Sequence, residues 1–367
     1  GRCRHGGCTQ PHHQQCTTAV EFGHSSTVID VTRFDRCFPC NDGFASRFPE
    51  RPQRRDALDD KAIEHGPRQD TDAGYHRAIV QLIRELGAWR RSSRIRVRRF
   101  DASAGWVAAT PTRHVRRSQL SISTFNVWFD PFFSDRRYQA IADLLAADPP
   151  DVMVFQEVTD VALEDFLAQR WIREHYLSAS VIGAGVGTYG MLLLSRVPVS
   201  AVRYTGLPSD ARRGLLRAEL LVNNARTVVC SVHLDSGKRS APLRERQLGR
   251  IFRALDADSD AVVLGDFNMR DRENHLIERP FRDVWPTLRP GEDGYTEDTS
   301  INDMRYDNTG KNRHVRFDRV LLKGQQWRPE SITLLGTEPI SPEHPRVFPS
   351  DHFGVRCVLS ARPPADP

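Results

Sequence analysis

The pattern of hydrophobic positions changes near residue 119. From there, short apolar runs of the length of buried strands alternate with segments whose apolar residues repeat at helical spacing. Helices are predicted at 136–147, which Pro149 and Pro150 end, and at 244–255. Strands are predicted at 120–125, 152–155, 189–194, 217–222, 227–232, 261–264, 314–317, 320–322 and 355–359. This alternation indicates an α/β sandwich.

The first 117 residues lack that regular alternation. Residues 1–70 show no sustained periodicity and are rich in Arg, Asp, Pro and Gly, so we expect a largely disordered leader. Further on, an apolar stripe from Ile79 to Trp89 predicts a helix, and 94–99 alternates like a strand with a basic face. These two elements are either the remnant of a small preceding domain or an appendage on the main one. The expected segments are therefore 1–70, 71–117, 118–361 and a tail over 362–367.

Polar side chains recur where the predicted strands end. Five sites lie at or just after an apolar run, and a sixth comes just before one. Such side chains converge on one edge of a sheet, where α/β proteins commonly build their sites. In chain order the sites contain Asn126, Glu157, His233, Asp266 with Asn268, Asp318 with Arg319, and Asp351 with His352.

These residue types suit the hydrolysis of a phosphodiester. Mg²⁺, with Mn²⁺ as an alternative, prefers oxygen ligands, which Glu157 supplies with help from Asp351 or Asn126. The metal offsets charge that develops on the phosphate oxygens. An attacking water must be held in line and deprotonated, which suits the carboxylate of Asp266.

The crowded oxyanion of such a reaction needs hydrogen-bond donors already in place. Asp318 is suited to orient His352 and to keep it protonated, because a nearby carboxylate favours the imidazolium form. The candidate donors are His233, His352, Asn268 and Arg270, and the candidate substrate-binding residues are Asn126, Arg270 and Arg319.

Each of these residues, taken alone, has a simpler interpretation. Asp266 and Asn268 are typical turn caps, and Glu157 is a plausible solvated acid at a strand end. The two histidines fit a satisfied core position, and Arg319 fits an ordinary surface arginine. That explanation requires six independent coincidences in the right order, so we favour the catalytic interpretation.

In this order the six motifs resemble the endonuclease/exonuclease/phosphatase superfamily over about residues 118–361. The stretches 265–273, 316–319 and 346–354 are similar to its tyrosyl-DNA phosphodiesterase 2 group. The resemblance implies a four-layer α/β sandwich, in which helices flank two packed mixed β-sheets. It also implies a Mg²⁺-dependent phosphoric diester hydrolase that acts on nucleic acid, at DNA or RNA ends, as in DNA repair.

The resemblance implies a role for each site residue. Glu157 would be the principal Mg²⁺ ligand, with Asn126 close to metal and phosphate. Asp266 would position or activate the attacking water. Asn268 would hold the water or the scissile phosphate, and His233 would contact a phosphate oxygen. His352, paired with Asp318, would stabilise the transition state. Arg270 would contact the substrate.

One position departs from the pattern of that group. Where it has Tyr-Thr-Trp-Asp-Thr, this chain has Tyr295-Thr296-Glu297-Asp298-Thr299. An aromatic side chain stacks on a base, whereas we expect the Glu297 carboxylate to repel phosphate. The departure concerns the substrate rather than hydrolysis itself.

Two other functions stay open at this point. One is a phosphatase or phosphodiesterase of the same superfamily for a small molecule or lipid head group. The other is a nucleic-acid-binding protein whose catalytic fold is inert. The glycine-rich run over 183–187 is expected to be a flexible connection and not a nucleotide cradle, because it follows no strand-to-helix phosphate motif.

Charge and hydropathy add a few constraints. Residues 1–117 hold 21 Lys/Arg against 13 Asp/Glu, which suits a nucleic-acid partner or an unfolded arginine-rich leader equally well. Mean hydropathy is −0.51, and no apolar stretch approaches the roughly 18 residues that a membrane helix needs. With no secretory signal pattern visible, we expect a cytoplasmic monomer without a membrane span.

Cysteine usage separates the leader from the rest of the chain. Five of the seven cysteines fall within residues 1–40, including Cys37-Phe38-Pro39-Cys40. Their spacing matches no standard zinc finger, so we favour unpaired thiols in the leader over a structural zinc site. Cys230 and Cys357 are expected to be small core residues.

Overall fold

The computed structural model describes residues 92–110, 114–183 and 186–362. The leader expected over 1–70, its cysteines, the helix expected between Ile79 and Trp89, and the last residues of the tail lie outside the described residues. Within the described part of the chain, no helix combines the length and the apolar character needed to cross a membrane.

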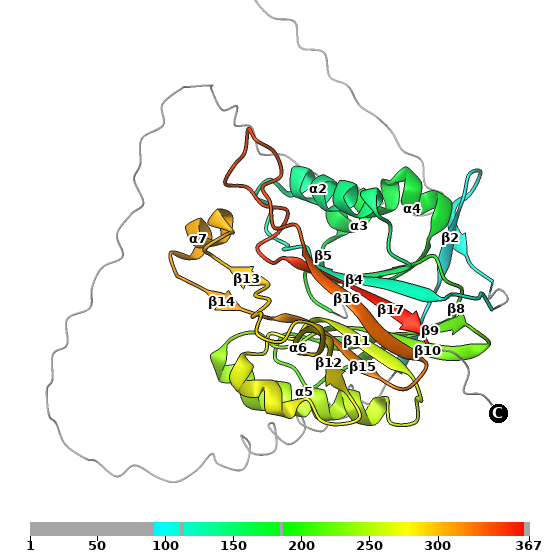
Figure 1. Cartoon of the computed structure of the whole chain (residues 1–367). Coiled ribbons are helices and arrows are strands. Elements are labelled where there is room, and N and C mark those ends of the chain that lie inside the picture. Colours follow the sequence, from blue (N-terminus) through cyan, green and yellow to red (C-terminus); the bar gives the residue numbers. More distant parts are fainter. Residues whose placement is uncertain (1–91, 111–113, 184–185, 363–367) are drawn as a thin grey trace, which may run out of the picture. The chain divides into compact units, whose positions relative to one another are not determined.

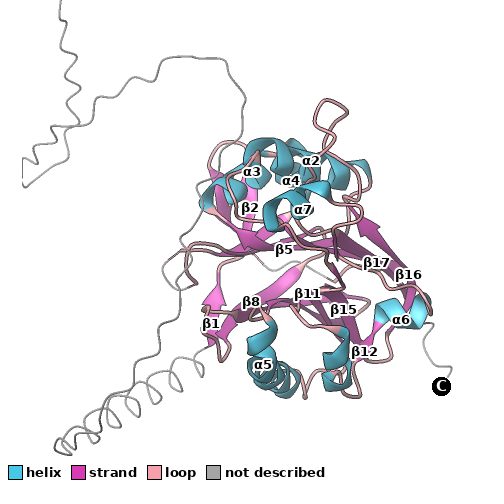
Figure 2. Ribbon diagram, turned by 90° about the vertical axis from the view of Figure 1, so that its left-hand side faces the viewer, coloured by secondary structure: helices cyan, strands magenta, loops and turns pink. Residues whose placement is uncertain are grey.

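Two β-sheets lie face to face, and helices cover their outer faces (Figure 1 and Figure 2). One sheet contains, in spatial order, β1 (Ser92–Ile95), β8 (Val199–Gly206), β9 (Gly214–Val222), β10 (Ala225–His233), β11 (Ala261–Asp266), β15 (Asp318–Lys323) and β12 (Arg282–Asp283). The other contains β16 (Trp327–Leu335), β17 (Gly354–Ala361), β4 (Gln119–Asn126), β5 (Val152–Val158), β7 (Gly190–Ser195), β6 (Leu177–Val181), β2 (Arg98–Asp101) and β3 (Gly105–Ala108). A separate ribbon pairs β13 (Glu297–Asp298) with β14 (His314–Val315).

Helices lie on the outer side of each sheet. The β4 to β7 side is covered by α2 (Ser134–Ala147), α3 (Asp160–Ala168) and α4 (Arg170–His175), while α5 (Ala241–Ala254) covers the β10 and β11 side. The shorter elements are η1 (Lys238–Ser240), η2 (Asp271–Leu276), α6 (Val284–Leu288) and α7 (Asp303–Thr309). The predicted four-layer sandwich of two mixed sheets flanked by helices is confirmed.

Three apolar layers hold the sandwich together. Ile122 and Val154 from one sheet and Val229 and Val262 from the other belong to the cluster between the sheets, where all four are fully buried. Separate clusters fill the space under α2 and α3 and the space under α5. The central strands β4, β5, β10 and β11 therefore alternate between two apolar environments, which is why the sequence shows continuous apolar runs there.

The parallel strand pairs determine where polar residues gather. β4 pairs with β5 and β10 with β11 in parallel, and each pair is joined by a helical crossover, through α2 and α5 respectively. The carboxyl ends of all four strands consequently reach the same edge of the sandwich, as the sequence predicts.

Two strand predictions need correction. The basic run over 94–99 is not one strand, because β1 pairs with β8 in one sheet and β2 pairs with β3 and β6 in the other. Ile95 and Val97 both pack against the cluster between the sheets, so the chain crosses from one sheet edge to the other between them. The strand expected at 314–317 is only the two-residue β14, and Asp318 begins β15 instead of following a strand.

Gly265 has a backbone conformation that a larger residue tolerates poorly. Its φ is +141°, and a Cβ there would lie 2.1 Å from the carbonyl oxygen of Val232 in the neighbouring strand. We expect Gly265→Ala to lower the free energy of unfolding by about 2–4 kcal/mol, as measured by urea denaturation.

Gly249, in the middle of α5, provides the matched control. A Cβ there would meet nothing closer than Arg253 Nη1 at 3.5 Å, so Gly249→Ala should stabilise the protein by about 0.5–1 kcal/mol. Equal effects of the two substitutions would contradict the strand geometry described.

Candidate active site

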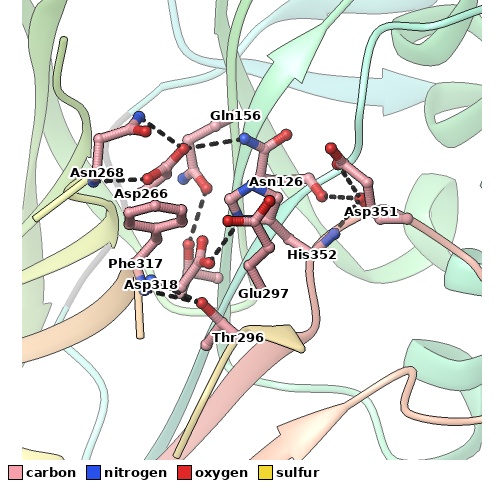
Figure 3. A network of polar contacts seen from close by, with 12 residues as sticks. Asn126, Gln156, Asp266, Asn268, Thr296, Glu297, Phe317, Asp318, Asp351 and His352 are labelled. Carbon is pink, nitrogen blue, oxygen red and sulfur yellow. Dashed lines mark hydrogen bonds and ion pairs between the residues drawn. The ribbon is translucent and has the colours of Figure 1, made fainter. Parts of the chain in front are cut away.

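The predicted site residues converge at the shared edge of the two sheets. Asn126 ends β4, His233 ends β10 and Asp266 ends β11. Asp318 begins β15, which runs antiparallel to β11, so the start of β15 lies beside the end of β11. His352 lies just before β17 and reaches Asp318 from the opposite sheet (Figure 3).

Asp266 is an almost fully buried acid of the site. Its side chain is 2% exposed and accepts hydrogen bonds from Asn126 Nδ2 (3.1 Å), from Asn268 Nδ2 (3.0 Å) and from the Asn268 backbone amide (2.7 Å). Burial raises the pKa of Asp266 to about 7; the charge of His352 opposes this shift and that of Asp318 adds to it. A carboxyl group with this pKa can accept a proton near neutral pH.

Asn268 is held in place by the turn that follows β11. Its φ is 51°, a left-handed conformation in which Asn is favoured over most residues. Its Nδ2 donates to the Leu234 carbonyl (3.1 Å) as well as to Asp266. The turn therefore fixes the amide against the carboxylate, as Figure 3 shows.

His352 and Asp318 form a buried ion pair. Nδ1 of His352 lies 2.8 Å from Asp318 Oδ2, and the backbone amides of Phe317 and Asp318 both donate to Thr296 Oγ1 at 3.0 Å. Burial alone would lower the pKa of His352, but the carboxylates of Asp318, Asp351 and Asp266 raise it well above 6.5. His352 is therefore an imidazolium at neutral pH, with Nδ1–H on Asp318.

His233 has the opposite protonation state. Its Nδ1 lies 2.9 Å from Arg213 Nη1, and a guanidinium only donates, so Nδ1 must accept and the ring proton is on Nε2. Nε2 lies 3.3 Å from Asp266 Oδ2 and 3.8 Å from Glu157 Oε1. Burial, and then the charges of Arg213 and His352, lower the pKa of His233 well below 6.5. A neutral histidine and a charged one thus face the same carboxylate.

A β-bulge turns Glu157 toward the site. The register of β5 against β7 shifts between Gln156 and Val158, and Glu157 has φ of 59°. Bulges of this kind commonly redirect a side chain next to active sites. Glu157 Oε2 accepts from the Phe129 amide at 3.2 Å, which fixes the carboxylate.

The donor set at this edge fits a divalent cation. Burial raises the pKa of Glu157, and the charge of Asp351 raises it further, so two carboxylates share a poorly hydrated space that a cation would neutralise. Asp318 Oδ1 is buried without a hydrogen-bond partner. Oxygen-rich sites of this kind suit Mg²⁺.

A second group of donors lies close to these residues. Donor atoms of Asp266, Asp318 and His352 lie within 4.8 Å of one another. In that group His352 is an imidazolium with a proton on each ring nitrogen, so neither nitrogen has a lone pair for a metal. Glu157 with Asp351 and Asn126 is therefore the set that fits Mg²⁺ better.

A model of the Endonuclease/Exonuclease/phosphatase family matches residues 123–352, which span all six motifs. The chain belongs to this family. Tyrosyl-DNA phosphodiesterase 2 of Xenopus laevis is 30% identical over 267 residues, covering 68% of this chain and 69% of the relative. The Homo sapiens protein of that name is 30% identical over 268 residues, covering 68% and 70%.

Solved structures agree with this family assignment. A crystal structure of D. rerio TDP2 complexed with a single-strand DNA product has a TM-score of 0.60 and 25% identity, covering 66% of this chain and all of that one. Truncated Caenorhabditis elegans TDP2 has a TM-score of 0.58 at 22% identity, covering 66% and 98%, and supports the fold alone. The resemblance to the endonuclease/exonuclease/phosphatase superfamily and its tyrosyl-DNA phosphodiesterase 2 group is confirmed.

The two arginines proposed to bind substrate in this family member differ in position. Arg270 is half-buried, with its guanidinium carbon 5.7 Å from the centre of the Phe317 ring, which in turn stacks on His352. Arg319 follows Asp318 in β15 and therefore points to the opposite face of the sheet. Its side chain has no exposure and donates to Asp283 (2.8 Å), so the structure does not bring Arg319 to the site.

Glu297 does not act as the sequence suggested. It is 0% exposed, and both Arg305 (2.5 Å) and Arg313 (3.4 Å) form ion pairs with it. A buried carboxylate neutralised by two arginines has no exposed charge with which to repel phosphate. Arg305 also binds Asp351 Oδ2 at 2.9 Å, which links Glu297 to the candidate metal ligands.

Two contributors to the site were missed from the sequence. Gln156 is fully buried and bridges the sheets by donating to Ser231 Oγ at 3.0 Å, while Thr124 Oγ1 donates to it at 3.1 Å. Arg213 sets the tautomer of His233. Gln156 does have a signal, because it directly follows the apolar run over 152–155 and precedes Glu157, whereas Arg213 is one arginine among many.

The buried charge of Asp266 should cost stability in metal-free protein. Because its pKa is about 7 in the folded chain and ordinarily 3.8, the folded state binds a proton between these values that the unfolded chain has released. Stability should therefore fall as the pH rises from about 4 to about 7. We expect Asp266→Asn to raise the melting temperature in EDTA by several degrees at pH 8 and by less at pH 5.

Asp256→Asn serves as the control, since it removes the same charge from an exposed position after α5. The melting temperatures of both variants are measured at pH 5 and pH 8 by thermal denaturation, monitored by circular dichroism. A melting temperature of Asp266→Asn below that of the unaltered protein at pH 8 would contradict the assigned pKa shift.

Proposed function

We propose that this chain is a divalent-metal-dependent phosphodiesterase that hydrolyses phosphodiester bonds at the ends of DNA strands, with 5′-tyrosyl DNA as the favoured substrate. The observation that carries the proposal is the buried Asp266 carboxylate, which lies between a neutral histidine and an imidazolium. Two further facts support it: the similar proteins of Xenopus laevis and Homo sapiens are tyrosyl-DNA phosphodiesterases 2, and the similar D. rerio TDP2 structure contains a single-strand DNA product.

The proposed metal ligands are Glu157, Asp351 and Asn126. Mg²⁺, when bound there, would neutralise charge that develops on the phosphate oxygens. Glu157 is fixed by the Phe129 amide, and Asp351 is fixed by Arg305. The carboxylates therefore keep their orientation whether or not substrate is present, which lowers the reorganisation that the reaction requires.

Asp266 is the proposed base. The side-chain amides of Asn126 and Asn268 donate to its Oδ2, and the Asn268 backbone amide donates to its Oδ1. Its pKa of about 7 allows it to accept a proton from an attacking water near neutral pH. Nε2 of His233 lies 3.3 Å from Oδ2 of the same carboxylate.

His352 is the proposed stabiliser of the phosphorane-like transition state. Its Nδ1–H is used by Asp318, and this leaves Nε2–H to donate to a phosphate oxygen. Because the imidazolium charge exists before substrate arrives, no proton transfer is needed to create it. Arg270, held beside His352 through the Phe317 ring, would bind a further phosphate oxygen.

The proposal is tested with end-labelled oligonucleotides that carry a 5′-tyrosyl group, a 5′-phosphate, a 3′-phosphoglycolate or an abasic site. With Mg²⁺ we expect release of tyrosine from the first substrate and no turnover in EDTA. Asp266→Asn should lower kcat at least about a thousandfold, because the base and the charge are both removed. Asp256→Asn, the exposed counterpart, should retain full activity.

Other outcomes identify the alternatives. Turnover of bis-p-nitrophenyl phosphate that is insensitive to salt, with no reaction at oligonucleotide ends, would indicate a small-molecule or lipid head-group enzyme. Binding of oligonucleotides without Mg²⁺-stimulated cleavage would indicate an inert nucleic-acid-binding protein. Unchanged activity in Asp266→Asn would reject the proposed base.

A further inference from the structure

The loop between β4 and α2 carries an exposed group of aromatic side chains. Phe129 is 45% exposed, Phe132 46% and Phe133 38%. They are three of the seven large hydrophobic side chains that are this exposed among the described residues, and they fall within five consecutive positions. Single exposed apolar residues are common, whereas such a concentration marks an interaction surface.

The loop that displays these rings is rigidly held. Arg137 of α2 is 0% exposed, and its guanidinium donates to the carbonyls of Val127 (3.0 Å), Trp128 (3.2 Å), Asp130 (2.6 Å) and Phe132 (2.7 Å). A fully buried arginine committed to four carbonyls of one loop fixes the backbone of that loop.

The backbone of the loop is also strained. Trp128 and Phe133 have positive φ angles of 55° and 50°, which bulky residues rarely adopt. Strain of this kind persists only where the surrounding structure enforces it, and it concentrates at functional sites. The exposed rings are therefore presented in one conformation and are not side chains of a loose loop.

The loop is continuous with the candidate active site. The amide of Phe129 donates to Glu157, and the Phe129 ring stacks on Tyr189 with a centroid distance of 4.8 Å and an interplanar angle of 28°. Tyr189 stacks in turn on His233, 6.0 Å away at 21°. A ladder of roughly parallel rings thus leads from the carboxylate of Asp266 to the exposed Phe129.

We propose that Phe129, Phe132 and Phe133 form a stacking platform for unpaired bases of a single DNA strand whose end lies in the active site. The inference rests on the proposed function, because it assigns the path of the same substrate. Aromatic rings stack on bases of any sequence, and each stacked base contributes about 1–3 kcal/mol. Arg136, whose guanidinium carbon lies 6.0 Å from the Phe133 ring centre, supplies a positive charge for the strand's phosphates.

The platform predicts that substrate length and base identity matter. We compare a 5′-tyrosyl mononucleotide, a 5′-tyrosyl tetranucleotide and the same tetranucleotide without its second and third bases. For the unaltered protein, kcat/KM should be highest on the complete tetranucleotide. In the double variant Phe129→Ala, Phe132→Ala, the preference for the complete over the abasic tetranucleotide should fall about tenfold.

Val161→Ala is the matched control, because Val161 is 52% exposed and lies on α3 outside the loop. It should leave the preference for the complete tetranucleotide as it is. Circular dichroism and the melting temperature establish that the double variant is folded. A double variant that keeps the full preference for the complete tetranucleotide would overturn the proposal.

A binding measurement separates this proposal from the proposed function. Fluorescence anisotropy of labelled oligo(dT) in EDTA reports the platform without catalysis, and the double variant should bind about tenfold more weakly. If the unaltered protein shows no Mg²⁺-dependent cleavage but this loss of binding appears, the proposed function fails and the platform stands. If cleavage is normal and the affinities are equal, the platform is wrong and the loop is a surface for another class of partner.

Discussion

Asp266 and Asp318 occupy directly opposite positions on neighbouring antiparallel strands, both almost fully buried. Two like charges in that arrangement repel each other and are poorly solvated, so the sheet tolerates them only with a compensating charge. His352 supplies it from the other sheet. This ion pair across the two sheets is the constraint on which the site depends, because it keeps one histidine charged and fixes its ring. The same contact joins the sheets at the edge where their apolar cluster ends.

Much of this arrangement was predictable from local sequence. Short apolar runs indicated the positions of the strands, and the polar residues that end the parallel strands had to meet at one edge of the sandwich. Asn126, Glu157, His233 and Asp266 follow from that rule. Asp318 was predicted to follow a strand, but it begins β15. Because β15 runs antiparallel to β11, its start lies at the same edge of the sandwich as the end of β11.

Other features depend on contacts between distant residues and leave no local pattern. Arg319 stands next to Asp318 in the same motif, so the sequence predicted both for the site. The alternation of side chains along β15 places Arg319 on the helix-covered face of the sheet, where it binds Asp283. Glu297 was expected to repel phosphate, because its two arginine partners, eight and sixteen residues away, could not be identified from spacing. The sequence around Arg137 does not distinguish it from an exposed helix arginine, because its partners are carbonyls of the loop between β4 and α2.

The buried acids proposed to be catalytic also reduce stability. Asp266 and Glu157 both have raised pKa values because they are buried, and Glu157 further requires a positive φ within a bulge. Local sequence preferences and global fold conflict at such positions, which are characteristic of functional sites. The aromatic rings of the β4–α2 loop show the same conflict on the surface, where apolar area is exposed on a strained backbone.

The most direct test of the central ion pair is to measure the protonation states of His233 and His352 in metal-free protein. Nitrogen NMR of the two imidazole rings over a range of pH reports these states. The account predicts that His352 remains protonated on both nitrogens at pH 8, with its Nδ1–H bonded to Asp318, while His233 is neutral with its proton on Nε2 at pH 6. Titration of both rings near the ordinary value of about 6.5 would show that the charges are not arranged as described.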